Sequence, residues 1–432
     1  MSVRITTLRA AAEIALGRQR SPQHAEGPHM VPYLRAANVK DGALDLSDVQ
    51  AMNFTPSEQK IFSLRPGDVL VTEGSGSLGT VGASAVWGGE LNGPVCFQNT
   101  LIRLRPREGV DARYLEWWAR SSFASGTFAS IASGANIYHL SAERVRALTF
   151  RQPPLEEQRR IADFLDAETA CLDGLIAAHR GVESKVLERR EAGIVAYVTG
   201  AHYVERRDST LAWVDSLPMS WQEVRLGLLA RMGSGHTPSR SRPEWWTNLT
   251  LPWITTGEVQ QVRDDRQEVI TETREKISEL GLANSAAELH PAGTVVLCRT
   301  ASAGYSAVMG TDMATSQDFV TWTCGPRLDP YFLLWSLRAM RQDLLGRLAM
   351  GSTHKTIYVP DLQMLRIPFP VIVEQREIVE NIRNQNQRID RLVDAVRRQV
   401  SLLAERRQAL ITAAVTGEFD VSTASGRGID VS

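Results

Sequence analysis

Two loops in the second half of the chain combine cationic and aromatic side chains. Residues 240–246 read Arg-Ser-Arg-Pro-Glu-Trp-Trp, and residues 351–358 read Gly-Ser-Thr-His-Lys-Thr-Ile-Tyr. Arginine, lysine, histidine and small polar side chains are the groups that contact phosphates and base edges in nucleic acids. These loops could therefore bind nucleic acid, although an ordinary polar surface would have a similar composition.

The first half of the chain has polar segments at the corresponding places, residues 18–22 and 134–139. Together with further polar and cationic residues near these segments, they form the predicted set of DNA contacts. The set is Arg18, Arg20, Arg35, Lys40, Asn136, Tyr138, His139, Arg240, Arg242, Trp246, Arg299, Thr300, Thr353, His354, Lys355 and Tyr358.

No pattern in the sequence predicts a catalytic site. The glycine-rich segment 74–79 (Gly-Ser-Gly-Ser-Leu-Gly) lacks the Gly-Lys-Ser/Thr ending of a phosphate loop, and the corresponding segment 299–304 lacks the glycines. A turn or an exposed loop between strands is the favoured interpretation. The sequence contains no Gly-x-Ser-x-Gly elbow, no His-Glu-x-x-His metal motif and no cluster of its 8 histidines. We therefore predict a chain that is not an enzyme and binds no metal.

Composition is that of a folded protein with two or three domains. The 432 residues are 43% hydrophobic and 22% charged, with a net charge of -1. The apolar runs are too short to span a bilayer, and no leader pattern opens the chain, so we expect a cytoplasmic location. The 4 cysteines include no close pair. Because the total charge is balanced, DNA binding would require arginines to gather on one face.

The chain contains a long internal repeat. The segment 153–200 returns as 370–417 without a gap, with 19 identities at 48 positions. Both copies open with Pro-x-x-x-Glu-Gln-Arg-x-Ile and close with Ala-x-x-Thr-Gly. The preceding regions repeat more loosely, with insertions and deletions. The organisation is a divergent segment followed by a constant one, twice over.

Six segments follow from this repeat. They are a first globular domain (1–152), a first long helix (153–200), a linker (201–220), a second globular domain (221–369), a second long helix (370–417) and a C-terminal tail (418–432).

The constant segments have the start, stop and spacing signals of long helices. Prolines and acidic residues stand at the start and glycine at the end. Apolar residues recur at steps of three and four, which is coiled-coil spacing, so the two helices are expected to pair. Spacing alone allows either orientation. The predicted pairing seam contains Leu165, Glu168, Leu172, Leu175, Ile382, Gln385, Ile389 and Leu392.

The divergent segments have short runs rich in apolar and β-branched residues, separated by Gly and Pro. Predicted strands lie at 68–71 and 100–104, and again at 294–297 and 319–322. A short helix follows each set of strands. The predicted fold class is therefore α+β, with two mixed globular domains separated by two long helices in a pseudo-twofold repeat.

This arrangement resembles the DNA-specificity subunit of type I restriction–modification systems, over nearly the whole chain. The resemblance rests on the order of the segments, on the two duplicated motifs and on Leu217-Pro218-x-x-Trp221 at the start of the second repeat. Each motif alone is only moderately specific, whereas their duplication in this order is strong. The first repeat departs from the pattern because it lacks the Leu-Pro-x-x-Trp sequence.

The resemblance implies that each globular domain recognises one half of a split, asymmetric site in double-stranded DNA. The helices would pair antiparallel, fix the gap between the half-sites and bind two methyltransferase subunits, which two translocase–nuclease subunits join. S-adenosylmethionine, ATP and Mg²⁺ would then be bound by those partners, and no cofactor by this chain. The alternatives are a scaffold in which a coiled coil separates two adaptor domains that do not bind DNA, and a fragment of a single-chain restriction enzyme. The complete repeat disfavours the second alternative.

Overall fold

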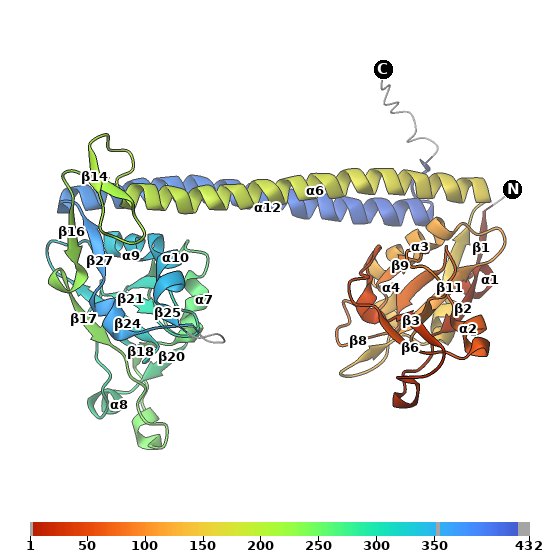
Figure 1. The fold of residues 1–432 in the computed structure, drawn as a ribbon, viewed down its shortest axis with the longest axis horizontal. Coiled ribbons are helices and arrows are strands. Elements are labelled where there is room, and N and C mark those ends of the chain that lie inside the picture. Colours follow the sequence, from red (N-terminus) through yellow and green to blue (C-terminus); the bar gives the residue numbers. More distant parts are fainter. Residues whose placement is uncertain (1–2, 351–354, 422–432) are drawn as a thin grey trace. The chain divides into compact units, whose positions relative to one another are not determined.

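The computed structural model describes residues 3–350 and 355–421 (Figure 1). Residues 1–179 and 399–432 make up a first compact unit, and residues 180–398 make up a second one. Each unit holds one globular domain and part of each long helix, so the unit boundary runs through both helices. The linear segments predicted from the sequence divide the chain differently, because sequence position does not show which domain each part of a helix contacts.

The domain of the first unit is built on two small sheets. The main sheet is antiparallel, in the order β2-β11-β7-β9, and the second has the order β10-β3-β6. The strand β1 pairs with β13, β4 with β5, and β8 with β12. The strands are β1 (Arg4–Thr7), β2 (Ala12–Leu16), β3 (Met30–Leu34), β4 (Val39–Lys40), β5 (Ala43–Leu44), β6 (Gln50–Asn53), β7 (Val69–Thr72), β8 (Gly74–Ser75), β9 (Ser84–Val86), β10 (Cys96–Phe97), β11 (Leu101–Pro106), β12 (Tyr138–His139) and β13 (Thr149–Gln152). The helices are α1 (Leu8–Ala11), α2 (Pro56–Phe62), α3 (Ala112–Ala124), α4 (Thr127–Ile131) and α5 (Ala142–Ala147).

The domain of the second unit repeats this plan with a larger main sheet. That sheet has the order β17-β24-β21-β22-β19, and a second sheet has the order β20-β18-β23. Three further two-stranded sheets are formed by β14 with β15, β16 with β27 and β25 with β26. The strands are β14 (Arg206–Asp208), β15 (Ser216–Pro218), β16 (Gln222–Arg225), β17 (Ala230–Ser234), β18 (Leu251–Ile254), β19 (Val269–Ile270), β20 (Glu275–Ile277), β21 (Val295–Cys298), β22 (Ser306–Met309), β23 (Ala314–Thr315), β24 (Phe319–Cys324), β25 (Ala349–Met350), β26 (Thr356–Ile357) and β27 (Arg366–Phe369). The helices are α7 (Val259–Val262), α8 (Glu279–Ala283), α9 (Pro330–Ala339), α10 (Arg341–Asp343) and α11 (Val359–Gln363).

These elements confirm the predicted fold class. The four predicted strands are β7, β11, β21 and β24, and the predicted short helices are α3 and α9. All four residues of β7 and of β21 are buried, as expected for a strand covered on both faces. The segment predicted as a linker contains the hairpin of β14 and β15.

The constant segments form the long helices α6 (Leu155–Val198) and α12 (Ile372–Thr416), which lie side by side within each unit (Figure 1). In the first unit Asp173 pairs with Arg407 at 2.9 Å. In the second unit Arg190 pairs with Asp390 at 3.0 Å, and Glu183 with Arg397 at 2.7 Å. Rising residue numbers on α6 meet falling numbers on α12, so the helices run antiparallel, as the family resemblance implied.

These ion pairs explain part of the sequence repeat. Asp390 is the repeat equivalent of Asp173, and Arg407 is the equivalent of Arg190. Each helix therefore supplies the aspartate of one pair and the arginine of the other. The same two positions must be kept in both copies because each pair needs one residue from each copy.

The pairing seam differs in part from the predicted one. Leu165, Leu172, Ile382 and Ile389 are buried, and Gln385 is half-buried. Three predicted members are corrected, because Glu168 is exposed and Leu175 and Leu392 are 44% and 46% exposed. The buried positions are their neighbours Thr169, Ile176 and Val393.

A buried glutamine fastens the start of each long helix to its domain. In the first unit the side-chain carbonyl of Gln158 accepts a hydrogen bond from the Asp111 N–H at 2.9 Å. Its amide group donates to the carbonyls of Gly109 at 3.0 Å and Pro153 at 2.8 Å. The Gln158 side chain has no exposed surface. It therefore joins the loop before α3 to the loop before α6.

The second unit repeats these three bonds. Gln375 accepts from the Asp329 N–H at 2.8 Å and donates to the carbonyls of Arg327 at 3.0 Å and Pro370 at 2.8 Å. Asp111 and Asp329 are also the N-caps of α3 and α9, since each carboxylate accepts from two backbone N–H groups of its helix. The long helix is thus bonded to the residue that starts the short helix.

A second contact ties each domain to the helix pair. In the second unit the guanidinium of Arg338 lies 4.8 Å from the centre of the Trp335 ring and donates to the Asp265 carbonyl at 2.8 Å. Arg190 of α6 donates to the same carbonyl at 3.2 Å. Burial lowers the pKa of Arg338 to about 10, while the carboxylate of Asp265 acts in the opposite direction.

The first unit has the equivalent stack. Arg120 lies 4.2 Å from the centre of the Trp117 ring and 3.7 Å from Asp41. The neighbouring Glu116 is buried, and burial raises the pKa of its carboxyl to about 7. The Trp117 indole of this stack donates to Asp166 of α6 at 2.8 Å, so the first domain is also held at a second place along the helices.

Replacing the glutamine should loosen the domain from the helix. We expect Gln375→Leu to lower the free energy of unfolding by about 3 kcal/mol, because it leaves one buried N–H and two buried carbonyls without partners. Urea unfolding followed by tryptophan fluorescence measures this change. Gln387→Leu, an exposed site on the same helix, is the matched control and should change stability by less than about 0.5 kcal/mol. Equal effects of the two variants would contradict the fastening role.

Candidate nucleic-acid interface

Two segments far apart in sequence form one loop surface in the first domain. The strand β8 pairs with β12, so that Ser75 lies opposite Tyr138 and Gly74 opposite His139. The Leu140 N–H also donates to the Glu73 carbonyl at 2.7 Å. The glycine-rich segment 74–79 is therefore a mostly exposed loop beside residues 133–139, between strands, as expected. Asn136 and His139 are exposed on this surface.

The second domain brings together the equivalent segments. The Ile357 N–H donates to the Arg299 carbonyl at 2.8 Å, at the position where Leu140 contacts Glu73. Lys355 and Tyr358, on either side of this contact, are exposed. The predicted contacts Thr353 and His354 lie outside the described residues. The same backbone arrangement thus carries Glu73 in one domain and Arg299 in the other, so the charge at this position is reversed.

A turn next to β11 or β24 extends each loop surface. In the first domain the Asn99 N–H donates to the Arg18 carbonyl at 2.9 Å, and the Glu73 N–H to the Thr100 carbonyl at 2.8 Å. In the second domain Thr237 donates to the side chain of Gln317 at 2.5 Å, and Arg299 to the Gln317 carbonyl at 3.0 Å. Segments after β2, β7 and β10 therefore meet in one surface, as do those after β17, β21 and β23.

The most projecting part of these surfaces is the loop 235–247 of the second domain. Figure 1 shows the segment between β17 and β18 at the end of its domain away from α6 and α12. The guanidinium of Arg240 lies 4.8 Å from the centre of the Trp246 ring, and the Trp246 indole donates to the Ser239 carbonyl at 3.1 Å. Trp246 also packs edge-on against Trp253, with ring centres 5.7 Å apart. The loop is therefore braced by its own aromatic residues.

This braced loop presents two largely exposed cations. The side chains of Arg240 and Arg242 are 68% and 63% exposed. Their ion pairs are long, 3.4 Å to Glu275 and 3.8 Å to Glu244, and a pair of this kind contributes little in water. Both guanidinium groups can exchange these contacts for phosphate or base contacts.

Two predicted DNA contacts of the first domain, Arg18 and Arg35, form ion pairs within that domain. Arg18 is only 7% exposed, lies 4.9 Å from the centre of the Phe54 ring and pairs with Glu58 at 3.0 Å. Its side chain therefore holds the loop and does not project from it, which corrects the expectation of an exposed contact. Arg35 is half-buried and pairs with Asp48.

Of the other predicted contacts, Lys40 and Arg20 are exposed and Thr300 is half-buried. Lys40 is exposed in the hairpin of β4 and β5, which is not one of the segments that form the loop surface. Arg20 is exposed in the segment after β2. Thr300 is half-buried and donates its hydroxyl hydrogen bond to Asp318.

The structure adds polar residues that the sequence prediction left out. Gln98 and Asn99 stand in the turn of the first domain, and Gln317 and Asp318 in that of the second. Their match across the repeat was visible in the sequence, but isolated polar pairs give no sign of a shared surface. They become candidates only because the turn joins the other two loops.

The described residues lack a cluster of metal ligands, and the Cys298 thiol in β21 is buried. They contain no group of three or more His, Cys, Asp or Glu side chains that could hold a metal ion. Burial raises the pKa of the Cys298 thiol, beside Thr300, to about 12, so it stays protonated at neutral pH. Over the described part of the chain, no helix is both long and apolar enough to cross a membrane.

Comparison with known proteins matches most of the chain to one protein family. The family described as Type I restriction modification DNA specificity domain matches residues 13–178 and 218–392, which together are more than three quarters of the chain. The Type I restriction enzyme StySPI specificity subunit of Salmonella potsdam is 29% identical over 201 residues. This match covers 46% of the present chain and 41% of the relative, so the chain aligns with less than half the length of that protein.

Solved structures share the whole fold. A chain from a study described as the structural basis of complex assembly and conformational transition of the type I R-M system superposes with a TM-score of 0.72. It is 19% identical, and the match covers 96% of this chain and 98% of that one. The HsdS subunit from Thermoanaerobacter tengcongensis, also 19% identical, has a TM-score of 0.54 and coverages of 96% and 97%. At this identity the likeness establishes the fold alone.

The braced loop supplies a test of the interface. We expect the double variant Arg240→Ala, Arg242→Ala to bind duplex DNA more weakly and to lower the slope of log K against log salt by about 1 to 2, because each lost phosphate contact removes about 0.9. Fluorescence anisotropy at several salt concentrations measures both quantities. Arg263→Ala, an exposed cation near the Asp265 contact, is the control and should leave the slope unchanged. An unchanged slope in the double variant would place the DNA contacts elsewhere.

Proposed function

Because this chain belongs to the type I restriction–modification DNA specificity family, we propose that it selects the DNA sequence on which a modification and restriction complex acts. Each globular domain would recognise one half of a split, asymmetric site in double-stranded DNA. The observation that carries this proposal is the pair of loop surfaces, which share one backbone arrangement and differ in their side chains.

The difference between the loop surfaces supports recognition of two different half-sites. Glu73 and Arg299 occupy equivalent positions but have opposite charge. The projecting loop of the second domain carries Arg240 and Arg242, whereas Arg18 in the corresponding region of the first domain is turned inward. Base edges present distinct donor and acceptor patterns in the major groove, so different side chains on one scaffold select different bases.

The long helices would fix the gap between the half-sites and bind the methyltransferase subunits. Support for the first role is that α6 and α12 each belong in part to both units and are joined by ion pairs in each. Support for the second is the outer face of the helices. Leu175 and Leu392 are equivalent, identical residues, yet neither enters the seam. An exposed leucine kept in both copies suits a partner that binds once per copy.

The chemistry would then belong to the partners. Two methyltransferase subunits would bind S-adenosylmethionine, and two translocase–nuclease subunits would bind ATP and Mg²⁺. This chain would contribute recognition and spacing without itself catalysing a step.

Sequencing of methylated bases tests recognition directly. Cells that express this chain with a cognate methyltransferase subunit should acquire one split methylated motif. Replacing residues 221–369 with the second domain of another family member should change one half of the motif and leave the other half and the gap unaltered. A change in both halves would contradict the assignment of one half-site to each domain.

A scaffold that does not bind DNA is the competing interpretation. It predicts a stable assembly with no methylated motif and no salt-dependent binding to duplex DNA. The same cells and the purified complex distinguish the two proposals.

Charge on the outer leucines tests the partner surface. We expect Leu175→Glu or Leu392→Glu to reduce the methyltransferase subunits bound per chain from two to one, and the double variant to bind none, because a buried unpaired carboxylate is costly. Mass measurement of the purified complex gives these numbers. Leu402→Glu is the control, since Leu402 is 55% exposed but its repeat equivalent is Lys185. Loss of partners in the control alone would contradict the assignment.

A further inference from the structure

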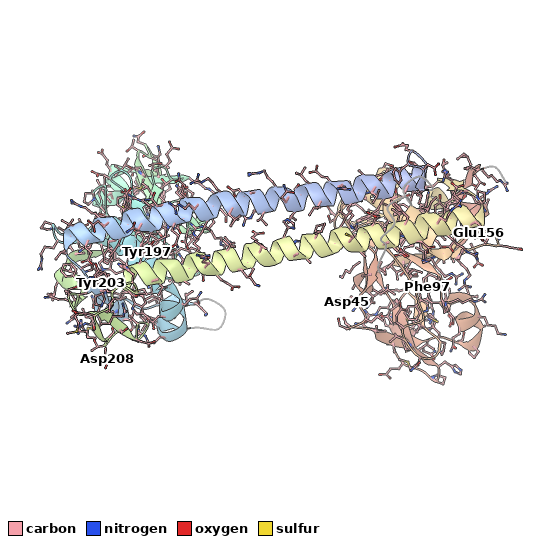
Figure 2. All side chains as sticks on the ribbon, turned by 90° about the horizontal axis from the view of Figure 1, so that it is seen from above. Asp45, Phe97, Glu156, Tyr197, Tyr203 and Asp208 are labelled. Atoms are coloured by element: carbon pink, nitrogen blue, oxygen red, sulfur yellow. The ribbon has the colours of Figure 1, made fainter. Side chains whose placement is uncertain are left out.

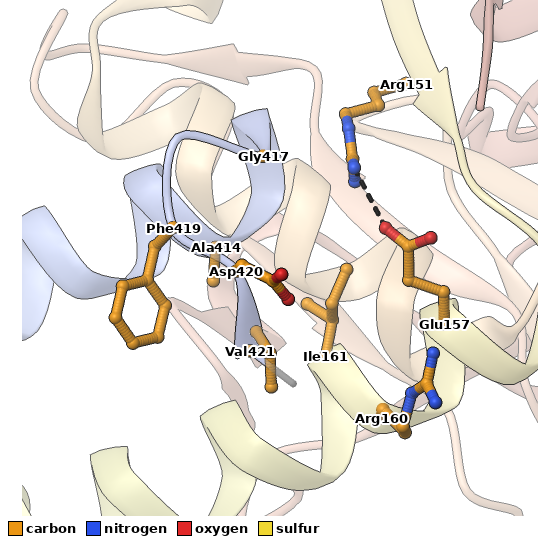
Figure 3. Close-up of a pocket in the computed structure, with 9 residues that line it drawn as sticks. All are labelled: Arg151, Glu157, Arg160, Ile161, Ala414, Gly417, Phe419, Asp420 and Val421. Carbon is orange, nitrogen blue, oxygen red and sulfur yellow. Dashed lines mark hydrogen bonds and ion pairs between the residues drawn. The ribbon is translucent and has the colours of Figure 1, made fainter. Parts of the chain in front are cut away.

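A pocket of about 380 Å³ lies in the first unit, where the start of α6 meets the end of α12 (Figure 3). Its walls include Glu157 and Ile161 from α6, Ala414 from α12, Gly417 and Arg151. This volume falls within the range of roughly 300 to 1,000 Å³ that ligand pockets span. The pocket is separate from the loop surfaces and from the outer leucines.

The repeat equivalent of this pocket is filled in the second unit. Glu374, Ile378, Tyr197 and Gly200 occupy the equivalent wall positions. The indole of Trp221 donates to the Glu374 carboxylate at 2.9 Å, and a Cβ atom on Gly200 would lie 2.5 Å from Pro218 and 3.1 Å from Trp221. The Leu-Pro-x-x-Trp segment therefore sits in this site and fastens the start of α12.

Two tyrosines complete the filled site. Figure 2 shows Tyr197 at the end of α6 and Tyr203 just beyond that end. Tyr203 hydrogen-bonds to the Glu374 carboxylate, which raises the pKa of its hydroxyl to about 12, and its ring centre lies 5.9 Å from that of Trp221. Trp221 and Tyr203 thus both hydrogen-bond to Glu374, and Tyr197 packs against the core of the second unit.

The first unit has smaller residues at all three positions. Arg4 pairs with Gln152 in the first unit, and Gln222 pairs with Phe369, the repeat equivalent of Gln152, in the second. Val3, the residue before Arg4, is therefore the equivalent of Trp221, the residue before Gln222. Val3 is 42% exposed. Ala414 replaces Tyr197, and Asp420 replaces Tyr203. These exchanges leave a pocket where the second unit has packed rings.

The pocket keeps polar groups that a bound segment could use. Glu157, the equivalent of Glu374, accepts from Nη2 of Arg151 at 2.9 Å and is 31% exposed. The Nη1 atom of Arg151 is buried and has no hydrogen-bond partner. The second unit has Pro368 at that position, which offers no donor. The pocket thus offers the Glu157 carboxylate and one guanidinium nitrogen that lacks an acceptor, and Asp420 also lines it.

We propose that this pocket binds an extended segment of a partner protein that inserts a tryptophan, as Leu217-Pro218-x-x-Trp221 does in the second unit. The indole N–H would donate to Glu157, and a backbone carbonyl of the segment would accept from Nη1 of Arg151. The ring would pack on Ile161 and Ala414. The bound segment would hold the start of α6 against the end of α12, as Trp221 holds the equivalent joint in the second unit.

A synthetic peptide tests this proposal on the full chain, independently of DNA recognition. The probe is a fluorescein-labelled peptide with the sequence of residues 215–224, Asp-Ser-Leu-Pro-Met-Ser-Trp-Gln-Glu-Val, and fluorescence anisotropy reports its binding. We expect saturable binding that weakens about tenfold or more when the peptide carries Trp221→Ala. A weakening of tenfold corresponds to about 1.4 kcal/mol.

Protein variants locate the binding site. Glu157→Leu removes the acceptor and Val421→Trp fills the pocket from its rim, so each should weaken binding of the peptide about tenfold or more. Glu156→Leu makes the same charge change at an exposed position at the start of α6 (Figure 2) and should leave binding unaltered. Absence of saturable binding to the unaltered chain would overturn the proposal. Undiminished binding to both pocket variants would also overturn it, because the peptide would then bind elsewhere.

Discussion

The architecture depends on one side-chain amide in each unit. Gln158 and Gln375 each make three hydrogen bonds without any exposed surface, and each joins the start of a long helix to the N-cap aspartate of a short helix. A buried amide that lost these partners would be costly, so the angle at which the domain meets the helix is set by bond geometry. The Trp117 indole bonded to Asp166 of α6, and the Asp265 carbonyl shared by Arg338 and Arg190 of α6, hold each domain at a second place, which restrains it from turning about the first.

The residues that recur in both copies of the repeat are those that make the contacts between helices and domains. In the motif Pro-x-x-x-Glu-Gln-Arg-x-Ile, the glutamine fastens the domain, the isoleucine enters the core and the glutamate bonds Arg151 in one unit and Trp221 in the other. The Asp and Arg of the later repeat positions form reciprocal pairs across the two helices. The constant residues therefore serve assembly, whereas the loops far from the helices are free to differ.

This division has a physical consequence for the two loop surfaces. The backbone bonds that join the loops, such as Leu140 to Glu73 and Ile357 to Arg299, place no demand on the side chains involved. Charge at these positions can therefore reverse between the domains while the surface keeps its form. One departure from symmetry on the assembly side is the pocket at Glu157, where small residues stand in place of the aromatic residues around Glu374.

Sequence alone determined the repeat, the two long helices and the α+β class, because these follow from local periodicity and composition. It could not determine the orientation of the helices, since steps of three and four suit both directions. The sequence also left open which residues besides Leu165 and Leu172 face the partner helix. One set with steps of three and four runs through Glu168 and Leu175, and another runs through Thr169 and Ile176. Only the burial of the side chains in the folded chain decided between these sets. Likewise, Arg18 and Arg240 look alike in sequence, and only the aromatic and acidic neighbours supplied by other segments turn one inward and leave the other exposed.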